Sequence, residues 1–75
     1  MIKKGQIVTL NDNIEYFILS EAVYNNNKYF YMTSLEDKSK VMICREDNGK
    51  LVAINDKETI ANLVLLFDKD IQTSF

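Results

Sequence analysis

Two glutamates in one apolar segment are the residues of this sequence best suited to acid–base chemistry. Glu15 and Glu21 share the alternation of Phe17 within residues 14–24, so a regular strand would bury both carboxyl groups. Burial raises the pKa of a carboxyl group, and two such groups could work as an acid and base pair. A bulge near Ser20 would instead leave both in solvent. We favour the solvated arrangement and expect no enzyme activity, because histidine is absent and the other acids are scattered.

Cys44 is the single cysteine, so it can form neither an internal disulfide nor a site made of several thiolates. It follows Met42 and Ile43 in an apolar segment, where a small buried residue fits better than a reactive thiol. The acidic loop at residues 35–40 offers oxygen atoms for a cation, but its spacing is not that of a calcium loop. We expect no metal, no cofactor and no small-molecule substrate.

The four tyrosines are the strongest candidates for contact with a partner. Alternation places all of them on one face of two neighbouring strands: Tyr16, Tyr24, Tyr29 and Tyr31. Tyrosine is enriched at protein interfaces because it offers a large area with a polar tip. An exposed aromatic face can also stack on single-stranded nucleic acid, but that needs interleaved positive charge, and only Lys28 is nearby. A third interpretation is that the tyrosines merely cover a thin sheet.

Apolar residues off the main stripe of a C-terminal helix provide a second candidate surface. Leu65, Leu66 and the terminal Phe75 widen the apolar face beyond what one sheet must cover. We therefore expect a protein partner or self-association as a homodimer, through Leu66 and the tyrosine face. A non-enzymatic interaction or regulatory module is the predicted function, and single-stranded nucleic-acid binding is the alternative.

Length and composition fit one small soluble domain. The chain has 75 residues, of which 47% are hydrophobic and 27% charged. These fractions are typical of a folded domain and too apolar for a disordered tail. The net charge of −2 lacks the basic cluster that nucleic acids or membranes attract. No apolar run resembles a signal peptide or reaches membrane-spanning length, so a cytoplasmic protein is expected.

Turn residues divide the first part of the chain into five expected strands, at residues 6–10, 14–24, 28–34, 40–46 and 50–54. The strongest signal is Asn48-Gly49, since both positions of a type I′ turn need positive φ. Counting outward from that turn pairs Asp47 with Lys50 and Cys44 with Ala53. A turn at Asn26-Asn27 is expected for the preceding hairpin.

That preceding hairpin sets the expected faces of the sheet. The turn at Asn26-Asn27 pairs Val23 with Phe30, and together with Met32 these residues form the predicted core face. The tyrosines then emerge on the opposite face, away from the helix.

From Asn55 onward the apolar residues recur at helical spacing, which predicts a helix over about residues 56–70. Asn55 and Glu58 have the form of a capping box at its start. Strands followed by one helix predict an α+β domain, a five-stranded antiparallel meander covered on one face by the helix. A strongly curled, barrel-like sheet with the helix as a lid is the alternative.

The layout is also similar to that of a family of small Gram-positive bacterial proteins, the domain of unknown function 1292 (YrzB-like) family. The resemblance runs along most of the chain, through Leu10, Asp12, Glu15–Leu19, Tyr29, Tyr31, Val41–Glu46, Leu51–Ile54, Asp56 and Glu58. It implies no catalytic residues, because the family has no established activity. The abundance of Asn, Lys and Ile is typical of AT-rich bacterial, mobile-element or phage genomes.

Overall fold

The structure is a computed structural model that describes residues 2–74. Five strands precede one helix: β1 (Ile7–Thr9), β2 (Glu15–Tyr24), β3 (Asn27–Ser34), β4 (Val41–Asp47), β5 (Lys50–Ala53) and α1 (Lys57–Ser74). Consecutive strands pair antiparallel in the order β1-β2-β3-β4-β5. The predicted α+β meander is confirmed, with strand bounds close to those expected. Phe75, expected to extend the helix surface, lies outside the described residues.

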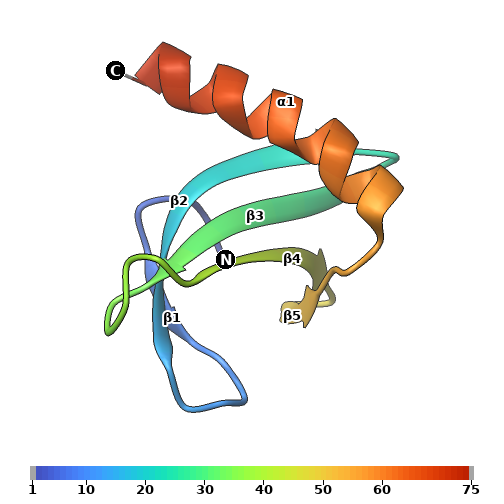
Figure 1. Ribbon diagram of the computed structural model, residues 1–75. Coiled ribbons are helices and arrows are strands. Elements are labelled where there is room, and N and C mark those ends of the chain that lie inside the picture. The colour runs from blue at the N-terminus through green and yellow to red at the C-terminus, as the bar shows by residue number, and fades with distance from the viewer. Residues whose placement is uncertain (1, 75) are drawn as a thin grey trace.

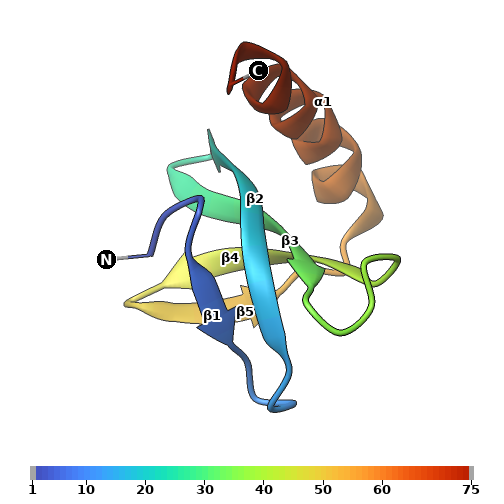
Figure 2. The same ribbon diagram turned by 90° about the vertical axis from the view of Figure 1, so that its left-hand side faces the viewer.

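The sheet curls into a half-barrel, which is the curled form of the expected fold. Figure 1 shows β1 and β5 on the two sides of the curl, below β2 and β3, while α1 lies across the outer side of the sheet over β2 and β3. Turned by 90°, the strands at the two ends of the sheet cross rather than run side by side (Figure 2). The two ends of the sheet therefore approach each other without pairing, and the curl stays open.

The β4–β5 hairpin forms as the sequence predicts. Asn48 and Gly49 have φ angles of 52° and 83°, the positive values that a type I′ turn requires. Asp47 pairs with Lys50, and Cys44 pairs with Ala53. Local turn chemistry alone sets this register.

The β2–β3 hairpin turns one residue earlier than expected. Asn25 and Asn26 carry the positive φ angles, 51° and 63°, so the predicted turn at Asn26-Asn27 is wrong. Tyr24 pairs with Asn27, the first residue of β3. Three consecutive asparagines offer two equivalent turn positions, because asparagine tolerates positive φ at either one.

A bulge in β2 has a larger consequence than the turn. The pairing passes from Ile18 opposite Met32 directly to Ser20 opposite Tyr31, so Leu19 is the extra residue. A one-residue insertion transfers the side chains on one side of it to the opposite face of the sheet. Tyr16 therefore shares a face with Met32 rather than with the other tyrosines. A bulge was expected near this point, but not this effect.

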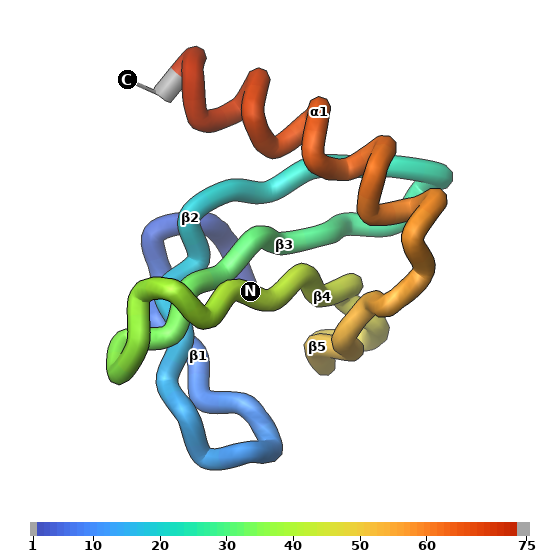
Figure 3. Tube along the Cα trace, viewed as in Figure 1, coloured from blue at the N-terminus to red at the C-terminus, as the bar shows by residue number. Residues whose placement is uncertain are grey.

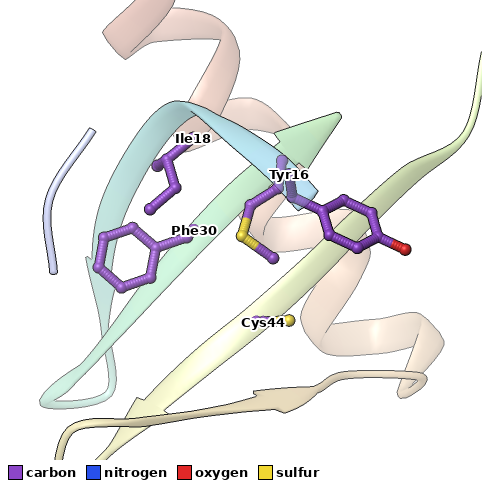
Figure 4. Packing of buried hydrophobic residues seen from close by; sticks show 5 residues of the cluster. Tyr16, Ile18, Phe30 and Cys44 are labelled. Atoms are coloured by element: carbon purple, nitrogen blue, oxygen red, sulfur yellow. The ribbon is translucent and has the colours of Figure 1, made fainter. Parts of the chain in front are cut away.

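The two faces of the sheet bury two separate clusters. Inside the curl, the buried residues are Tyr16, Ile18, Phe30, Met32 and Cys44. Figure 4 shows Tyr16, Ile18, Phe30 and Cys44 reaching into this interior from β2, β3 and β4. On the outer side, Tyr29 packs with Leu63 and Phe67 of α1. Val23, predicted to join the core, is 70% exposed, because it lies next to the hairpin turn where nothing covers it.

The helix begins one residue later than predicted and continues to Ser74, beyond the expected end. The chain reaches it by a short segment after β5 and then runs back over the sheet (Figure 3). Asp56 caps its N-terminus, since the carboxylate accepts hydrogen bonds from the backbone and hydroxyl of Thr59. The predicted capping box of Asn55 and Glu58 is therefore wrong by one position. α1 lacks the long apolar stretch that crossing a bilayer would require of a helix.

Candidate partner-binding cleft

Tyr16 does not join the expected tyrosine face. Its ring is fully buried inside the curl, and its hydroxyl donates a hydrogen bond to Asp12 Oδ2 over 3.1 Å. The bulge at Leu19 is the reason, because it directs the side chains of the first half of β2 to the opposite faces of the sheet. A partner therefore reaches Tyr16 only if the core opens.

The other predicted binding residues come together, but beneath the helix. Tyr29 is 5% exposed, and Tyr31 stacks on Phe67 with ring centroids 5.7 Å apart. Tyr24 accepts a hydrogen bond from Asn62 of α1, and Leu66 packs into the same cluster. The expectation of an exposed tyrosine face is wrong, because α1 covers the side of the sheet that the sequence left open. The flat aromatic surface needed for base stacking is covered as well.

The two candidate acidic residues point to separate surroundings. Glu15 is exposed at the start of β2. Glu21 accepts a hydrogen bond from the backbone N–H of Lys4 over 2.9 Å, and its other oxygen lies 3.5 Å from Lys28 Nζ. Neither glutamate lines the cleft described below. The structure does not bring these two carboxylates to a shared site.

A polar cluster that the sequence did not reveal joins three distant segments at the bulge. Ser20 Oγ donates to Asp70 Oδ2 over 2.7 Å, and Lys4 Nζ lies 3.0 Å from Asp70 Oδ1. The Ser20 hydrogen bond is the main reason that the pKa of Asp70 is lowered. Ser20 is fully buried, so this cluster fixes the helix on the sheet rather than offering a reactive hydroxyl. A small polar residue inside an apolar strand was the one available sequence signal.

A cleft lies between the two ends of the sheet, on the side away from α1. It has a volume of about 870 Å³ and is bordered by residues of β1 and the following turn, by β5, and by Ile2. Met42 and Cys44 of β4 also line it. Clefts that hold ligands have volumes of roughly 300–1,000 Å³. Sequence alternation could not locate this cleft, because it exists only once the sheet has curled.

The cleft is apolar along its length and polar at its ends. Val8, Leu10 and Leu51 are half-buried and pack against the inner cluster. Asp12 follows β1 at one end, and Lys50 begins β5. A hydrogen bond from the backbone N–H of Ile14 is the main cause that lowers the pKa of Asp12, so its carboxyl group is ionised at neutral pH.

Cys44 lines the wall of the cleft, and its thiol belongs to a class of side chain that often acts as a nucleophile. Burial raises its pKa to about 11, and 1% of the residue is exposed. Because the thiolate is the nucleophilic form, a thiol of this kind is unreactive near neutral pH. The expectation that Cys44 is buried is confirmed.

A smaller hollow of about 280 Å³ lies beside α1, where Tyr31 and Ile43 of the sheet meet Val64 and Ile71 of the helix. Val64 is half exposed at its rim. Tyr31 is thus the predicted binding residue that borders an open hollow. This hollow has about a third of the volume of the cleft between β1 and β5.

Within residues 2–74, no three side chains of the His, Cys, Asp and Glu types meet in a way that could hold a metal ion. Comparisons with family models, curated proteins and solved structures find no match for this chain. The resemblance to the domain of unknown function 1292 family stays a prediction.

Proposed function

We propose that this protein is a non-enzymatic interaction module whose protein partner occupies the cleft between β1 and β5. The observation that carries the proposal is the open curl of the sheet, which leaves an apolar cleft between its two ends. An apolar centre with a polar rim is the usual anatomy of a protein interface. This proposal places the contact surface on the side of the sheet opposite to the tyrosine face that the sequence predicted.

The chemistry of the cleft supports binding rather than catalysis. Its one thiol has a pKa of about 11. Asp12 is held by hydrogen bonds from Ile14 and Tyr16, so its carboxylate has structural partners. The small acidic excess of the chain also disfavours a nucleic-acid backbone, which binds to concentrated positive charge.

Selection from a displayed library of short random peptides tests this function. Leu51→Lys places a charge in the cleft, and Leu65→Lys is the matched control because Leu65 is 72% exposed on α1. We expect the native protein and Leu65→Lys to enrich the same peptides and Leu51→Lys to lose them at least tenfold. Thermal unfolding of both variants verifies that they are folded.

Two outcomes contradict the proposal. One is that no peptide is enriched on the native protein. The other is that the enriched peptides bind Leu51→Lys as well as they bind the native protein, because the contact would then lie elsewhere.

A further inference from the structure

We infer that the partner contributes an extended segment, which lies in the cleft as a sixth strand antiparallel to both β1 and β5. This inference rests on the proposed function and specifies the conformation and the direction of the bound segment. It follows from the backbone groups, the strand directions and the charges around the cleft.

The outer edge of β1 presents backbone groups to the cleft. The backbone N–H of Ile18 in β2 donates to the Gln6 carbonyl over 3.0 Å, so the backbone of Gln6 faces β2. Residues of an antiparallel strand alternate between bonding one neighbour and facing the other side. Val8 therefore faces β2, whereas Ile7 and Thr9 direct their N–H and C=O groups toward the free edge.

The edge of β5 presents a matching pair. The backbone N–H of Ile54 donates to the Ile43 carbonyl over 2.9 Å, so the backbone of Ile54 faces β4. Val52 lies two residues earlier and pairs with Arg45, so its backbone faces β4 as well. By the same alternation, Leu51 and Ala53 direct their backbone groups away from β4. Free edges of this kind are templates for an added strand, and strand addition is a common mode of peptide recognition.

Strand direction selects an antiparallel segment. Each strand of the sheet runs opposite to its neighbour, so β1 and β5 have the same sense along the sheet. The two strands cross (Figure 2), so the added segment lies at an angle to each of them, as neighbouring strands of a twisted sheet do. A closed ring of alternating strands needs an even number of them. One added strand that is antiparallel to both ends completes the alternation and removes both free edges.

The walls of the cleft then determine which side chains the segment carries. Alternate residues of a strand point to the same side, so every second residue should be apolar and face Val8, Leu10 and Leu51. An antiparallel segment starts near Asp12, where β1 has ended, and finishes near Lys50, where β5 begins. A basic residue at its start and an acidic residue at its end complement these charges.

The probe is a synthetic peptide of sequence KVTVTVE with both ends blocked, and EVTVTVK is its charge-reversed control. We expect KVTVTVE to bind with a Kd at or below about 1 mM and EVTVTVK several-fold more weakly. Hydrogen exchange measured by NMR should slow at the amides of Ile7, Thr9, Leu51 and Ala53. Those of Val8 and Val52 already pair within the sheet and should change little.

Peptides with methylated backbone nitrogens separate the two edges. In a strand, successive residues bond opposite neighbours, so methylating the valine amides blocks one edge and methylating the threonine amides blocks the other. Both changes should abolish binding. If only one of the two methylated peptides loses binding, the segment pairs with a single edge and the proposal of a closed ring is wrong.

The outcomes also separate this inference from the proposed function. One outcome is that library peptides lose binding to Leu51→Lys and yet slow hydrogen exchange at none of the four edge amides. That outcome supports the interaction module but overturns the sixth strand. Equal binding of KVTVTVE and EVTVTVK overturns the assigned direction. Absence of binding by KVTVTVE and by every library peptide overturns both proposals.

Discussion

The hydroxyl of Ser20 donates a hydrogen bond to the carboxylate of Asp70 over 2.7 Å, which joins the bulge of β2 to the last turns of α1. The two residues are 50 positions apart in the chain. Ser20 is fully buried, so the pair fixes the helix at a point where water cannot replace the lost bond.

Replacing Ser20 with alanine should lower the free energy of unfolding by about 1.5–3 kcal/mol, because hydrogen bonds to charged groups contribute in this range. Urea denaturation followed by circular dichroism measures the change. Ser39→Ala in the exposed loop after β3 is the control and should stay within about 0.5 kcal/mol. Equal stability of the two variants would contradict a structural role for the Ser20 hydroxyl.

The same carboxylate predicts how stability depends on pH. The pKa of Asp70 is lowered below the ordinary value of 3.8, first by the Ser20 hydrogen bond and further by Lys4. A folded-state pKa below the unfolded value stabilises the protein above that unfolded value, and the stabilisation is lost as pH falls through the folded pKa. The unfolding free energy should therefore be level near neutral pH and fall below about pH 4.

Urea titrations at a series of pH values test this dependence in the native protein and in Asp70→Asn. The variant should be less stable at neutral pH and should lose less stability on acidification. Some slope should remain, since the pKa values of Asp12, Asp37 and Asp56 are lowered as well. An identical slope in both proteins would exclude Asp70 as a contributor.

Tyr16 and Val23 test the face reversal caused by the bulge. Tyr16→Ala should reduce the unfolding free energy by about 3–5 kcal/mol, the usual cost of truncating a buried aromatic residue. Val23→Ala should change it by about 0.5 kcal/mol or less, because Val23 is 70% exposed. The regular alternation of β2 predicts the opposite order. Denaturation of the two variants under the same conditions distinguishes them.

Cys44 should resist thiol reagents while the protein is folded. Burial raises the pKa of its thiol to about 11, so little thiolate exists at pH 8 and the sulfur is covered. Reaction with a chromogenic disulfide reagent should be at least a hundredfold slower for the native protein than for the protein unfolded in urea. Comparable rates in the two states would show that the inner cluster opens readily.

Local features of the sequence predicted much of the fold. Asn48-Gly49 determined both the position and the register of the last hairpin, because only certain residues accept positive φ at both turn positions. The change from alternation to helical spacing after Asn55 located α1 to within a few residues. The turn at Asn25-Asn26 was missed by one position, since the neighbouring asparagine satisfies the same requirement.

Features that depend on distant segments were not predicted. The parity of Glu15 and Glu21 indicated a bulge near Ser20, but it did not identify Leu19 as the extra residue. That position depends on pairing with β3 and on the hydrogen bond from Ser20 to Asp70. The cleft between β1 and β5 arises from the curl of the whole sheet. No single segment carries information about that curl.

The sequence by itself determined the order of strands and helix, and which side chains within a short segment share a face. Only the tertiary structure decided which face α1 covers. Both faces of β3 are apolar, with Phe30 and Met32 on one and Tyr29 and Tyr31 on the other. Alternation cannot rank two apolar faces. A curled sheet buries one of them against itself, so the helix covers the tyrosines and an apolar cleft is left on the open side of the curl.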